Sequence, residues 1–374
     1  MRGIQQSKMA RFYQGKRVFV TGHTGFKGSW LTLWLHLMGA EVHGYALEPL
    51  SEPSLFKVLE LQQKITHVVG DIRDYDKLKG LIKRFQPEII FHLAAQPLVR
   101  LSYAEPRMTY ETNVMGTVNV LEAARSTPST RVLVNITSDK CYENKEWDYA
   151  YRENDPLGGY DPYSSSKGCA ELVAAAYRSS YFTSESGLRL ASVRAGNVIG
   201  GGDWAVDRII PDIVRTLVLD KPVQVRNPDA VRPWQYVLEP LSGYLWLAYQ
   251  LWQVGVVYDG AWNFGPPSRS NIPVRQVVDQ ALRTWGRGEW TDAECSGLKL
   301  HEAGVLKLDC SKANNLLHWE PVLDVEETIV RTVRWYFDYY HGHDPKGMWA
   351  RTVAEIQFYA ERARTKTISW AGVE

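Results

Sequence analysis

The fold of this chain is decided near its beginning, by the stretch Arg17-Val18-Phe19-Val20-Thr21-Gly22-His23-Thr24-Gly25-Phe26-Lys27-Gly28. Its first five residues predict a buried strand. The glycines predict a tight turn that lets the backbone approach a pyrophosphate, and a helix from Ser29 to about Met38 follows, with Gly39 as its C′ residue. Glycines mark turns of every kind, so the evidence is the position of this motif between a strand and a helix.

Strands and helices alternate through the first half of the chain. Further strands are expected at 41–45, 66–69, 88–92, 131–136 and 190–194, and helices at 74–85, 109–125 and 163–180. This alternation predicts an α/β fold with a Rossmann-like doubly wound parallel sheet. Residues 15–195 are expected to form the nucleotide-binding domain, with segments at about 232–265 returning to its sheet. Residues 196–231 and 266–374 are expected to form a smaller C-terminal substrate-binding domain, and residues 1–14 a loosely held extension.

Composition narrows the function classes. The chain has 374 residues and a formal net charge of +1, which gives no reason to expect nucleic acid as a partner. It contains no apolar run long enough for a membrane span and no apolar signal-peptide core, so we expect no membrane partner. The four cysteines are Cys141, Cys169, Cys295 and Cys310. Their wide separation predicts reduced thiols in a cytoplasmic protein rather than a metal site or a disulfide framework.

Two acidic positions bear on the nucleotide. Asp71, at the end of the third predicted strand, is placed either to bond an adenine amino group or to cap the next helix. The second strand has no acid at its tip, where one usually bonds the adenosine ribose, and Glu48 is a nearby candidate. The sequence therefore favours NAD over NADP without settling it. Lys27 lies inside the glycine turn and is interpreted either as a phosphate contact or as a solvated side chain.

A Tyr-x-x-x-Lys pair provides the candidate chemistry. Tyr163 and Lys167 lie four residues apart and share one face of a helix. An ammonium beside a phenol is expected to lower the tyrosine pKa from its usual value of ~10, which would let it act as a base toward a substrate hydroxyl. Such pairs are also common on solvated surfaces. The upstream glycine turn and Ser138, just past the fifth strand, favour the catalytic interpretation.

Several motifs together resemble the extended short-chain dehydrogenase/reductases and, within them, the sugar-nucleotide 4,6-dehydratases. Besides the glycine turn and the Tyr/Lys pair, the stretches that carry the resemblance are His92-Leu93-Ala94-Ala95-Gln96, Thr112-Asn113-Val114, Thr137-Ser138-Asp139-Lys140-Cys141-Tyr142, Gly159-Tyr160-Asp161-Pro162-Tyr163, Gly196-Asn197-Val198-Ile199-Gly200-Gly201-Gly202-Asp203-Trp204 and Val231-Arg232-Pro233-Trp234-Gln235. The resemblance spans about residues 14–340. These motifs are far more specific in combination than singly.

Asp139 and Lys140 discriminate within that family. Related enzymes acting on dTDP-glucose carry Thr-Asp-Glu where this chain has Ser138-Asp139-Lys140, and Asp-Lys is expected in the branch acting on CDP-D-glucose. Without the resemblance, Asp139-Lys140 would be interpreted as a solvated loop. The resemblance implies that Tyr163 assists oxidation at C4, that Lys140 removes the C5 proton and that Asp139 protonates the departing C6 hydroxyl.

The resemblance also implies roles for further residues. The expected catalytic residues are Ser138, Asp139, Lys140, Tyr163 and Lys167. The expected NAD-binding residues are Gly22, Thr24, Gly25, Phe26, Lys27, Gly28, Asp71, Ile72, Leu93, Ala94, Ala95, Asn113, Tyr163 and Lys167. The expected substrate-binding residues are Gln96, Arg100, Asn197, Arg208, Arg232 and Trp234, since a diphosphate needs arginine and amide donors. No metal is expected, and the family's members are usually homodimers built through two long helices of each subunit.

The chain departs from the family's pattern at Tyr236, where a histidine usually follows Trp-Gln, and this departure bears on base recognition. Other sugar-nucleotide short-chain enzymes, namely dTDP- or GDP-sugar dehydratases and 4-epimerases, remain alternatives. A NAD-sensing regulatory protein on the same fold is a further alternative. Such proteins commonly lose the Tyr/Lys pair, whereas this chain keeps both Tyr163 and Lys167.

Overall fold

A parallel sheet of seven strands forms the centre of the protein. The computed structural model describes residues 7–293, 305–342 and 344–372. The strand order is β11-β6-β5-β4-β1-β2-β3, and every neighbouring pair is parallel. The strands are β1 (Arg17–Thr21), β2 (Glu41–Ala46), β3 (Thr66–Val69), β4 (Ile89–His92), β5 (Val132–Ile136), β6 (Arg189–Ala195) and β11 (Gly260–Phe264). The order reverses between β1 and β4, and open sheets of this kind bind ligands at the carboxyl ends of the strands beside that reversal.

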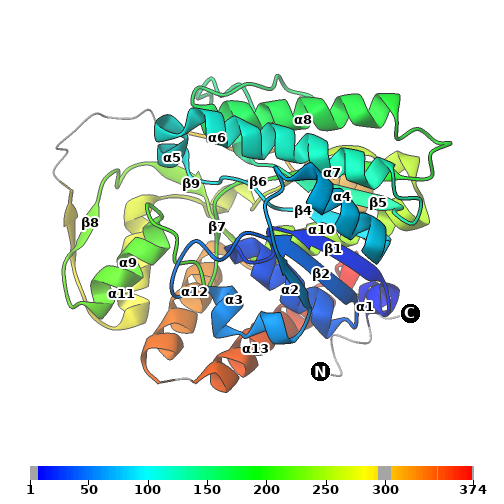
Figure 1. Cartoon of the computed structure of the whole chain (residues 1–374). Helices are drawn as coiled ribbons and strands as arrows, with labels where there is room; N and C mark the ends of the chain where they lie inside the picture. Colours follow the sequence, from blue (N-terminus) through cyan, green and yellow to red (C-terminus); the bar gives the residue numbers. More distant parts are fainter. Residues whose placement is uncertain (1–6, 294–304, 343, 373–374) are drawn as a thin grey trace.

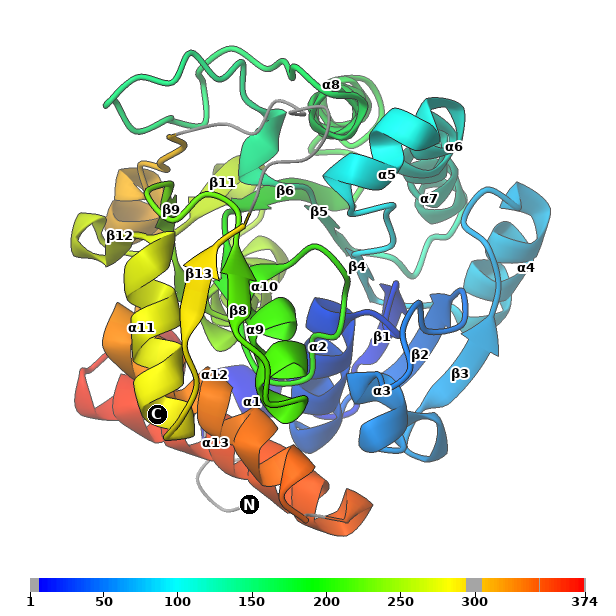
Figure 2. The same cartoon turned by 90° about the vertical axis from the view of Figure 1, so that its left-hand side faces the viewer.

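Helices cover both faces of the sheet, which confirms the predicted doubly wound architecture. One face carries α4 (Tyr75–Phe85), α7 (Gly116–Arg125) and α8 (Pro162–Ser180), and the other carries α2 (Phe26–Leu37) and α10 (Leu238–Gln253) (Figure 1). Because both faces are covered, the central strands are buried along their length; every residue of β4 and β5 is buried. Figure 2 shows the strands fanned from β3 at one edge to β11 at the other.

Element boundaries agree with the sequence predictions except at two helices. The strands match within one residue. Helix α2 begins at Phe26 rather than at the predicted Ser29, because the extended Gly25 occupies the N-cap. Gly39 has φ +80°, as expected of a C′ glycine. The predicted helix at 109–125 begins earlier, as α6 (Pro106–Tyr110) with proline in its first turn, and a π-helical turn at Glu111–Met115 separates it from α7.

The chain after Ala195 builds a lobe in front of the sheet as Figure 2 draws it. Its helices are α9 (Ile209–Val218), α11 (Val274–Trp285) and α12 (Val325–Tyr340). Its strands pair as β7 (Val198–Ile199) with β10 (Gln235–Tyr236), β8 (Val223–Val225) with β13 (Trp290–Asp292), and β9 (Val231–Pro233) with β12 (Asn271–Pro273). Residues 232–265 do return to the sheet through α10 and β11. The division into two domains stays a prediction.

Helices near both ends of the described part of the chain pack against helices that cover the sheet. Helix α1 (Lys8–Tyr13) buries Met9 and Tyr13, and the Tyr13 hydroxyl donates a 2.8 Å hydrogen bond to the Leu245 carbonyl. The expectation of a loosely held extension is therefore wrong for residues 7–14, while residues 1–6 lie outside the described part. Helix α13 (Pro345–Thr365) places the Tyr359 ring 5.9 Å from that of Trp34 in α2, so it packs against a helix that covers the sheet.

Three of the four cysteines, Cys141, Cys169 and Cys310, are free thiols, and Cys295 lies outside the described residues. Within the described ranges, no cluster of histidine, cysteine and acidic side chains is arranged to hold a metal ion. None of the helices in those ranges combines the length and apolar character needed to cross a membrane.

Candidate active site

The glycine turn after β1 forms a backbone cradle at the switch point of the sheet. Gly22 has φ +74°, and a Cβ there would lie 2.6 Å from the Ala94 backbone nitrogen. A Cβ on Gly28 would lie 2.1 Å from the Gly22 oxygen, so only glycine lets α2 pack this close to the turn. Gly25 is exposed and caps α2 without a side-chain hydrogen bond, which leaves the first N–H groups of a twelve-residue helix open to a ligand. These features fit the diphosphate of a dinucleotide.

Two acidic residues lie near the cradle: Asp71, which is bonded to Arg73, and Glu48, which is exposed. The Asp71 carboxylate accepts hydrogen bonds from the backbone and side chain of Arg73, and these bonds hold its pKa below the usual value despite partial burial. The alternative that Asp71 caps the next helix is wrong, because Asp74 occupies that N-cap. Glu48 is exposed two residues beyond the end of β2. The adenosine-binding roles of both residues stay predictions.

Asn113 connects the loop after β4 to helix α8. It lies in the π-helical turn, a local distortion that is frequent at functional sites. Its side chain accepts a 2.8 Å hydrogen bond from the Gln96 backbone and donates one of 2.8 Å to the Ser166 hydroxyl. The Gln96 side-chain amide donates to Thr109, and its oxygen accepts from the Leu98 backbone. Both predicted binding residues thus already hold the loop in place.

The loop after β5 presents the candidate acid. The Ser138 hydroxyl donates a 2.9 Å hydrogen bond to Asp139, and both side chains are buried. Burial raises the pKa of Asp139, and Lys140, Ser138 and Lys27 only partly oppose that effect. A Cβ on Gly196 would lie 2.8 Å from the Asp139 carboxylate, so this glycine makes room for it. The raised pKa favours the protonated form of Asp139, which is the form that a general acid uses.

Tyr163 lies beside this loop, in the first turn of α8. Burial raises the pKa of its phenol to about 12, while contact with Ser138 and the positive charge of Arg208 lower it and Asp139 raises it. The expectation of a lowered pKa is wrong for the ligand-free protein, because desolvation outweighs the nearby cations. The ammonium of Lys167 is itself destabilised: burial and Lys27 lower its pKa to about 8.

Lys27 interacts electrostatically with Asp139, Lys167 and Arg208, which the sequence did not predict. Burial and Arg208 lower its pKa to about 8, whereas Asp139 raises it. Its ammonium also acts on Lys167. Lys27 thus brings positive charge to Asp139 and Arg208 brings it to Tyr163, which suits a site that must stabilise developing oxyanions.

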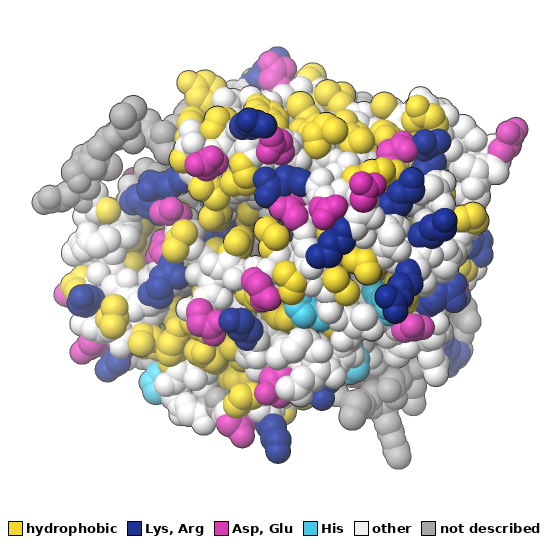
Figure 3. Space-filling model, in the orientation of Figure 1, with side chains coloured by type: hydrophobic (Ala, Val, Ile, Leu, Met, Phe, Trp, Pro, Cys, Tyr) yellow, Lys and Arg dark blue, Asp and Glu magenta, His cyan; other side chains and the backbone are white. Residues whose placement is uncertain are grey.

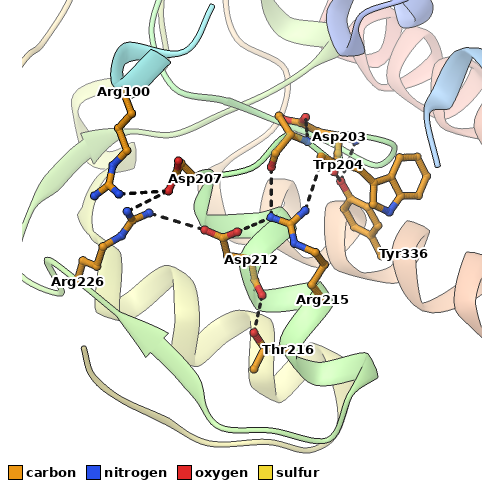
Figure 4. Close-up of polar contacts among 10 residues, drawn as sticks. Arg100, Asp203, Trp204, Asp207, Asp212, Arg215, Thr216, Arg226 and Tyr336 are labelled. Carbon is orange, nitrogen blue, oxygen red and sulfur yellow. Dashed lines mark hydrogen bonds and ion pairs between the residues drawn. The ribbon is translucent and has the colours of Figure 1, made fainter. Parts of the chain in front are cut away.

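Two of the predicted substrate arginines, Arg100 and Arg208, lie around the loop before α9. Arg208 donates to Asp203 at 2.8 Å and lies near Tyr163. Figure 4 shows Asp207 between Arg100 and Arg226, at 3.6 Å and 3.1 Å. Arg226, at the end of β8, was not among the predicted residues. A carboxylate between two half-exposed guanidiniums is held weakly, since exposed ion pairs contribute about 0–1 kcal/mol.

The remaining predicted substrate residues differ in exposure. Asn197 is half-buried, next to the glycine that faces Asp139, and Arg232 is half-buried on β9. Trp234 is buried, and its indole N–H donates to the Ile272 carbonyl, so little of its ring is available for stacking. Tyr236 is also buried, and its hydroxyl donates to Glu355 of α13 at 3.0 Å. It therefore points into the core, which removes the reason to connect it with base recognition.

Three buried residues behind the site were missed. Thr137 precedes the acid loop, Glu171 lies one turn after Lys167, and Arg194 is on β6. Glu171 had a sequence signal, because residues four apart share a helix face. Arg194 had none, because it joins the others only when β6 pairs with β5.

Comparisons with known proteins agree with this geometry. The family model of GDP-mannose 4,6 dehydratase matches residues 19–260. The solved structure of the dTDP-glucose 4,6-dehydratase DesIV from Streptomyces venezuelae, with NAD bound, is 26% identical and has a TM-score of 0.71, covering 86% of this chain and 96% of that one. An epimerase from Methanothermobacter thermautotrophicus has a TM-score of 0.74 at 24% identity, over 90% and 96% of the two chains, and supports the fold alone.

The parallel sheet, the glycine cradle and the Tyr163/Lys167 pair define a nucleotide-binding short-chain dehydrogenase/reductase. Within that class, the chain belongs to the family of GDP-mannose 4,6-dehydratase and related sugar-nucleotide dehydratases. CDP-glucose 4,6-dehydratase of Salmonella typhimurium strain LT2 is 55% identical to it over 339 residues, which are 89% of this chain and 94% of that relative.

Proposed function

We propose that this protein converts CDP-D-glucose to CDP-4-dehydro-6-deoxy-D-glucose and water, with NAD as a tightly held cofactor. The observation that carries the proposal is the buried Asp139, with its raised pKa, in contact with Ser138 beside Tyr163. A 4-epimerase needs no such proton donor for a leaving hydroxyl. The 55% identity with a CDP-glucose 4,6-dehydratase supports the same assignment.

The site residues divide the reaction into two stages. Tyr163 accepts the proton of the C4 hydroxyl in its phenolate form, which the positive charge of Arg208 favours against the effect of burial. Once C4 is a ketone, the C5 proton is acidic, and the half-buried Lys140 removes it. Asp139 then donates its proton to the departing C6 hydroxyl, so that water leaves, and a proton is later restored at C5.

NAD would be held by the cradle at Gly22, Gly25 and Gly28, with Asp71 and Glu48 toward its adenosine end. When bound, it takes up a hydride from C4 and returns it to C6. The segment from Leu47 to Glu52 contains two glutamates and no lysine or arginine, which favours NAD over a cofactor carrying a 2′-phosphate. On the substrate, the diphosphate requires cations, and Arg208, Arg232 and Arg100 are the candidates.

We further propose that the protein acts in the cytoplasm as a homodimer, in the synthesis of deoxysugars for a cell-surface polysaccharide. Hydrophobic side chains gather along the upper edge of Figure 3, over the helices that Figure 1 labels α6 and α8. Tyr110, Met115 and Leu172 of this helical layer are 37%, 52% and 59% exposed. A second copy burying this layer is the proposed occupant, because an apolar surface on adjacent parallel helices suits a symmetric helix bundle.

The proposed reaction is tested by incubating the protein with CDP-glucose and catalytic NAD. The expected product is a 4-keto-6-deoxy sugar, seen by the absorbance that it develops in alkali, without accumulation of NADH. Competition among CDP-, dTDP- and UDP-glucose tests the base. Binding of NAD without turnover of any nucleotide sugar would favour the sensor alternative instead.

A further inference from the structure

A fully buried ion pair lies directly behind the candidate active site. Glu171 of α8 and Arg194 of β6 are 2.9 Å apart, and each side chain is 3% exposed. Desolvating two charges is costly, and well-packed apolar side chains often serve stability as well or better. A buried pair is therefore weak evidence for a purely stabilising role, and the hydrogen bonds that it makes indicate what else it does.

One end of the loop that carries Asp139 and Lys140 is bonded to this ion pair through Thr137. The Thr137 hydroxyl donates to the second oxygen of Glu171 at 2.5 Å. Thr137 directly precedes Ser138 and Asp139, so its side chain fixes the point at which the loop leaves β5. The bond is buried and involves a carboxylate, which makes it stronger than a neutral surface bond.

The other end of the loop is tied through Tyr142. Arg194 donates to the Tyr142 hydroxyl at 2.7 Å, and its guanidinium also lies 4.8 Å from the centre of the Tyr142 ring. The same hydroxyl donates to Asn263 of β11 at 2.7 Å. Tyr142 directly follows the turn at Asp139–Cys141. Both ends of a loop that carries two reacting groups are thus anchored to one ion pair.

The ion pair also acts on the helix that carries Tyr163 and Lys167. Glu171 lies one helical turn after Lys167 on α8, and its negative charge raises the pKa of Lys167 against the effect of burial. The loop packs closely on the same helix: a Cβ on Gly168 would lie 3.3 Å from the Cys141 carbonyl. The distance between the Tyr163/Lys167 helix and the Asp139/Lys140 loop is therefore set by contacts that converge on Glu171.

We propose that Thr137, Glu171 and Arg194 are positioning residues, which hold the Asp139/Lys140 loop in register with the Tyr163/Lys167 helix so that elimination follows oxidation. This proposal rests on the proposed function, because it assigns the loop to elimination and the helix to oxidation. Loosening the loop should slow elimination and leave the earlier oxidation largely intact. Reduced cofactor should then accumulate during turnover.

Thr137→Val tests the proposal, because it removes the hydroxyl and preserves the side-chain shape. The expected result is a kcat lowered by about 10- to 100-fold, as a small misplacement of a catalytic group can produce, with KM unchanged. The near-ultraviolet absorbance of reduced nicotinamide should rise in the steady state of the variant and should not rise in that of the wild type. Thr137→Ser keeps the hydroxyl and should restore both readouts. Thr127→Val removes another buried threonine hydroxyl, which donates to the Ala123 carbonyl of α7 at the far end of the sheet. This control variant should leave the kinetics unchanged.

The outcomes separate this proposal from the function on which it rests. A Thr137→Val enzyme with wild-type kcat, or one with lowered kcat and no reduced cofactor, contradicts the positioning role. Inactivity of the wild type toward CDP-glucose contradicts the proposed function itself. If Thr137→Val does not fold, Tyr142→Phe releases the opposite end of the loop and must show the same accumulation of reduced cofactor for the proposal to stand.

Discussion

The Ser138 hydroxyl donates a 2.9 Å hydrogen bond to the Asp139 carboxylate, and Ser138 also contacts the phenol of Tyr163. One hydroxyl thus connects the candidate base of the oxidation stage to the candidate acid of the elimination stage. Because the two stages use different residues, substitutions should interrupt the reaction at different points.

Tyr163→Phe should abolish the first stage. Loss of the proton acceptor is expected to lower kcat by roughly 10²- to 10⁴-fold and to leave NAD binding intact, because general-base catalysis contributes about that much. Turnover of CDP-glucose and NAD binding by titration are the measurements. Tyr160→Phe removes a hydroxyl from a tyrosine that is 79% exposed three residues earlier, and should behave as wild type. Unchanged turnover in Tyr163→Phe would remove this residue from the mechanism.

Asp139→Asn should interrupt the second stage instead. Without a proton for the leaving C6 hydroxyl, kcat should fall by roughly 10²- to 10⁴-fold, while oxidation at C4 still proceeds and reduced cofactor accumulates in the site. Absorbance during a single turnover reports it. Asp148→Asn is the control, because that carboxylate is fully solvent-exposed. A variant that forms no reduced cofactor would place Asp139 in the oxidation stage.

Stability should depend on pH through Lys27. Its pKa is lowered by burial to about 8 in the folded protein, below its usual 10.5. Between those values the unfolded chain binds one more proton, so this residue makes the free energy of unfolding rise with pH, by up to about 1.4 kcal/mol per pH unit. The destabilisation is greatest below pH 8 and is relieved above it.

Urea unfolding of the ligand-free wild type and of Lys27→Met, at several pH values between about 8 and 10.5, measures the contribution of Lys27 to the free energy of unfolding. The wild type should gain stability relative to Lys27→Met as pH rises. The exposed Lys346→Met should show no such trend. Parallel curves for wild type and Lys27→Met would mean that Lys27 is solvated rather than buried.

The N-terminal helix should matter for stability and not for catalysis. Tyr13 is fully buried, so Tyr13→Ala should lower the free energy of unfolding by about 3–5 kcal/mol, with KM unchanged. Gln14→Ala alters the exposed neighbour and should stay within about 0.5 kcal/mol of wild type. Denaturant unfolding of both variants measures the difference. A Tyr13→Ala protein as stable as the wild type would restore the view of a loosely held extension.

Base selection should not depend on Tyr236. Its hydroxyl bonds Glu355, which also pairs with Arg331 and Arg351, so Tyr236→Phe should cost about 1 kcal/mol of stability. The ratio of kcat/KM for CDP-glucose over dTDP-glucose should stay that of the wild type. A shifted ratio would show that this core contact reaches the nucleotide pocket.

The sequence predicted most of the features that depend on residues close together in the chain. The bounds of the strands were predicted to within one residue, because buried parallel strands appear in a sequence as short apolar runs. The glycine cradle was predicted because its backbone conformations require glycine. The placement of Tyr163 and Lys167 one turn apart on α8 follows from helix periodicity. The π-helical turn at Asn113 was missed; there the side chain bonds Gln96 and Ser166, contacts that no local sequence pattern marks.

What escaped prediction depends on contacts between distant segments. Helix α1 was interpreted as an extension because its buried positions have partners more than two hundred residues away, such as Leu245 for Tyr13. The pKa of Tyr163 was predicted in the wrong direction, because spacing reveals the lysine and not the burial of the phenol. Arg194 meets Glu171 only in the folded sheet, so no local pattern marks it.

The central claim is that the hydride removed from C4 returns to C6 of the same sugar. CDP-glucose carrying deuterium at C4, incubated with the wild-type protein and catalytic NAD, tests it most directly. The expected product is CDP-4-dehydro-6-deoxy-glucose with the deuterium at C6, detected by mass spectrometry and NMR. Deuterium found in solvent or in free NADH, with none at C6, would contradict it.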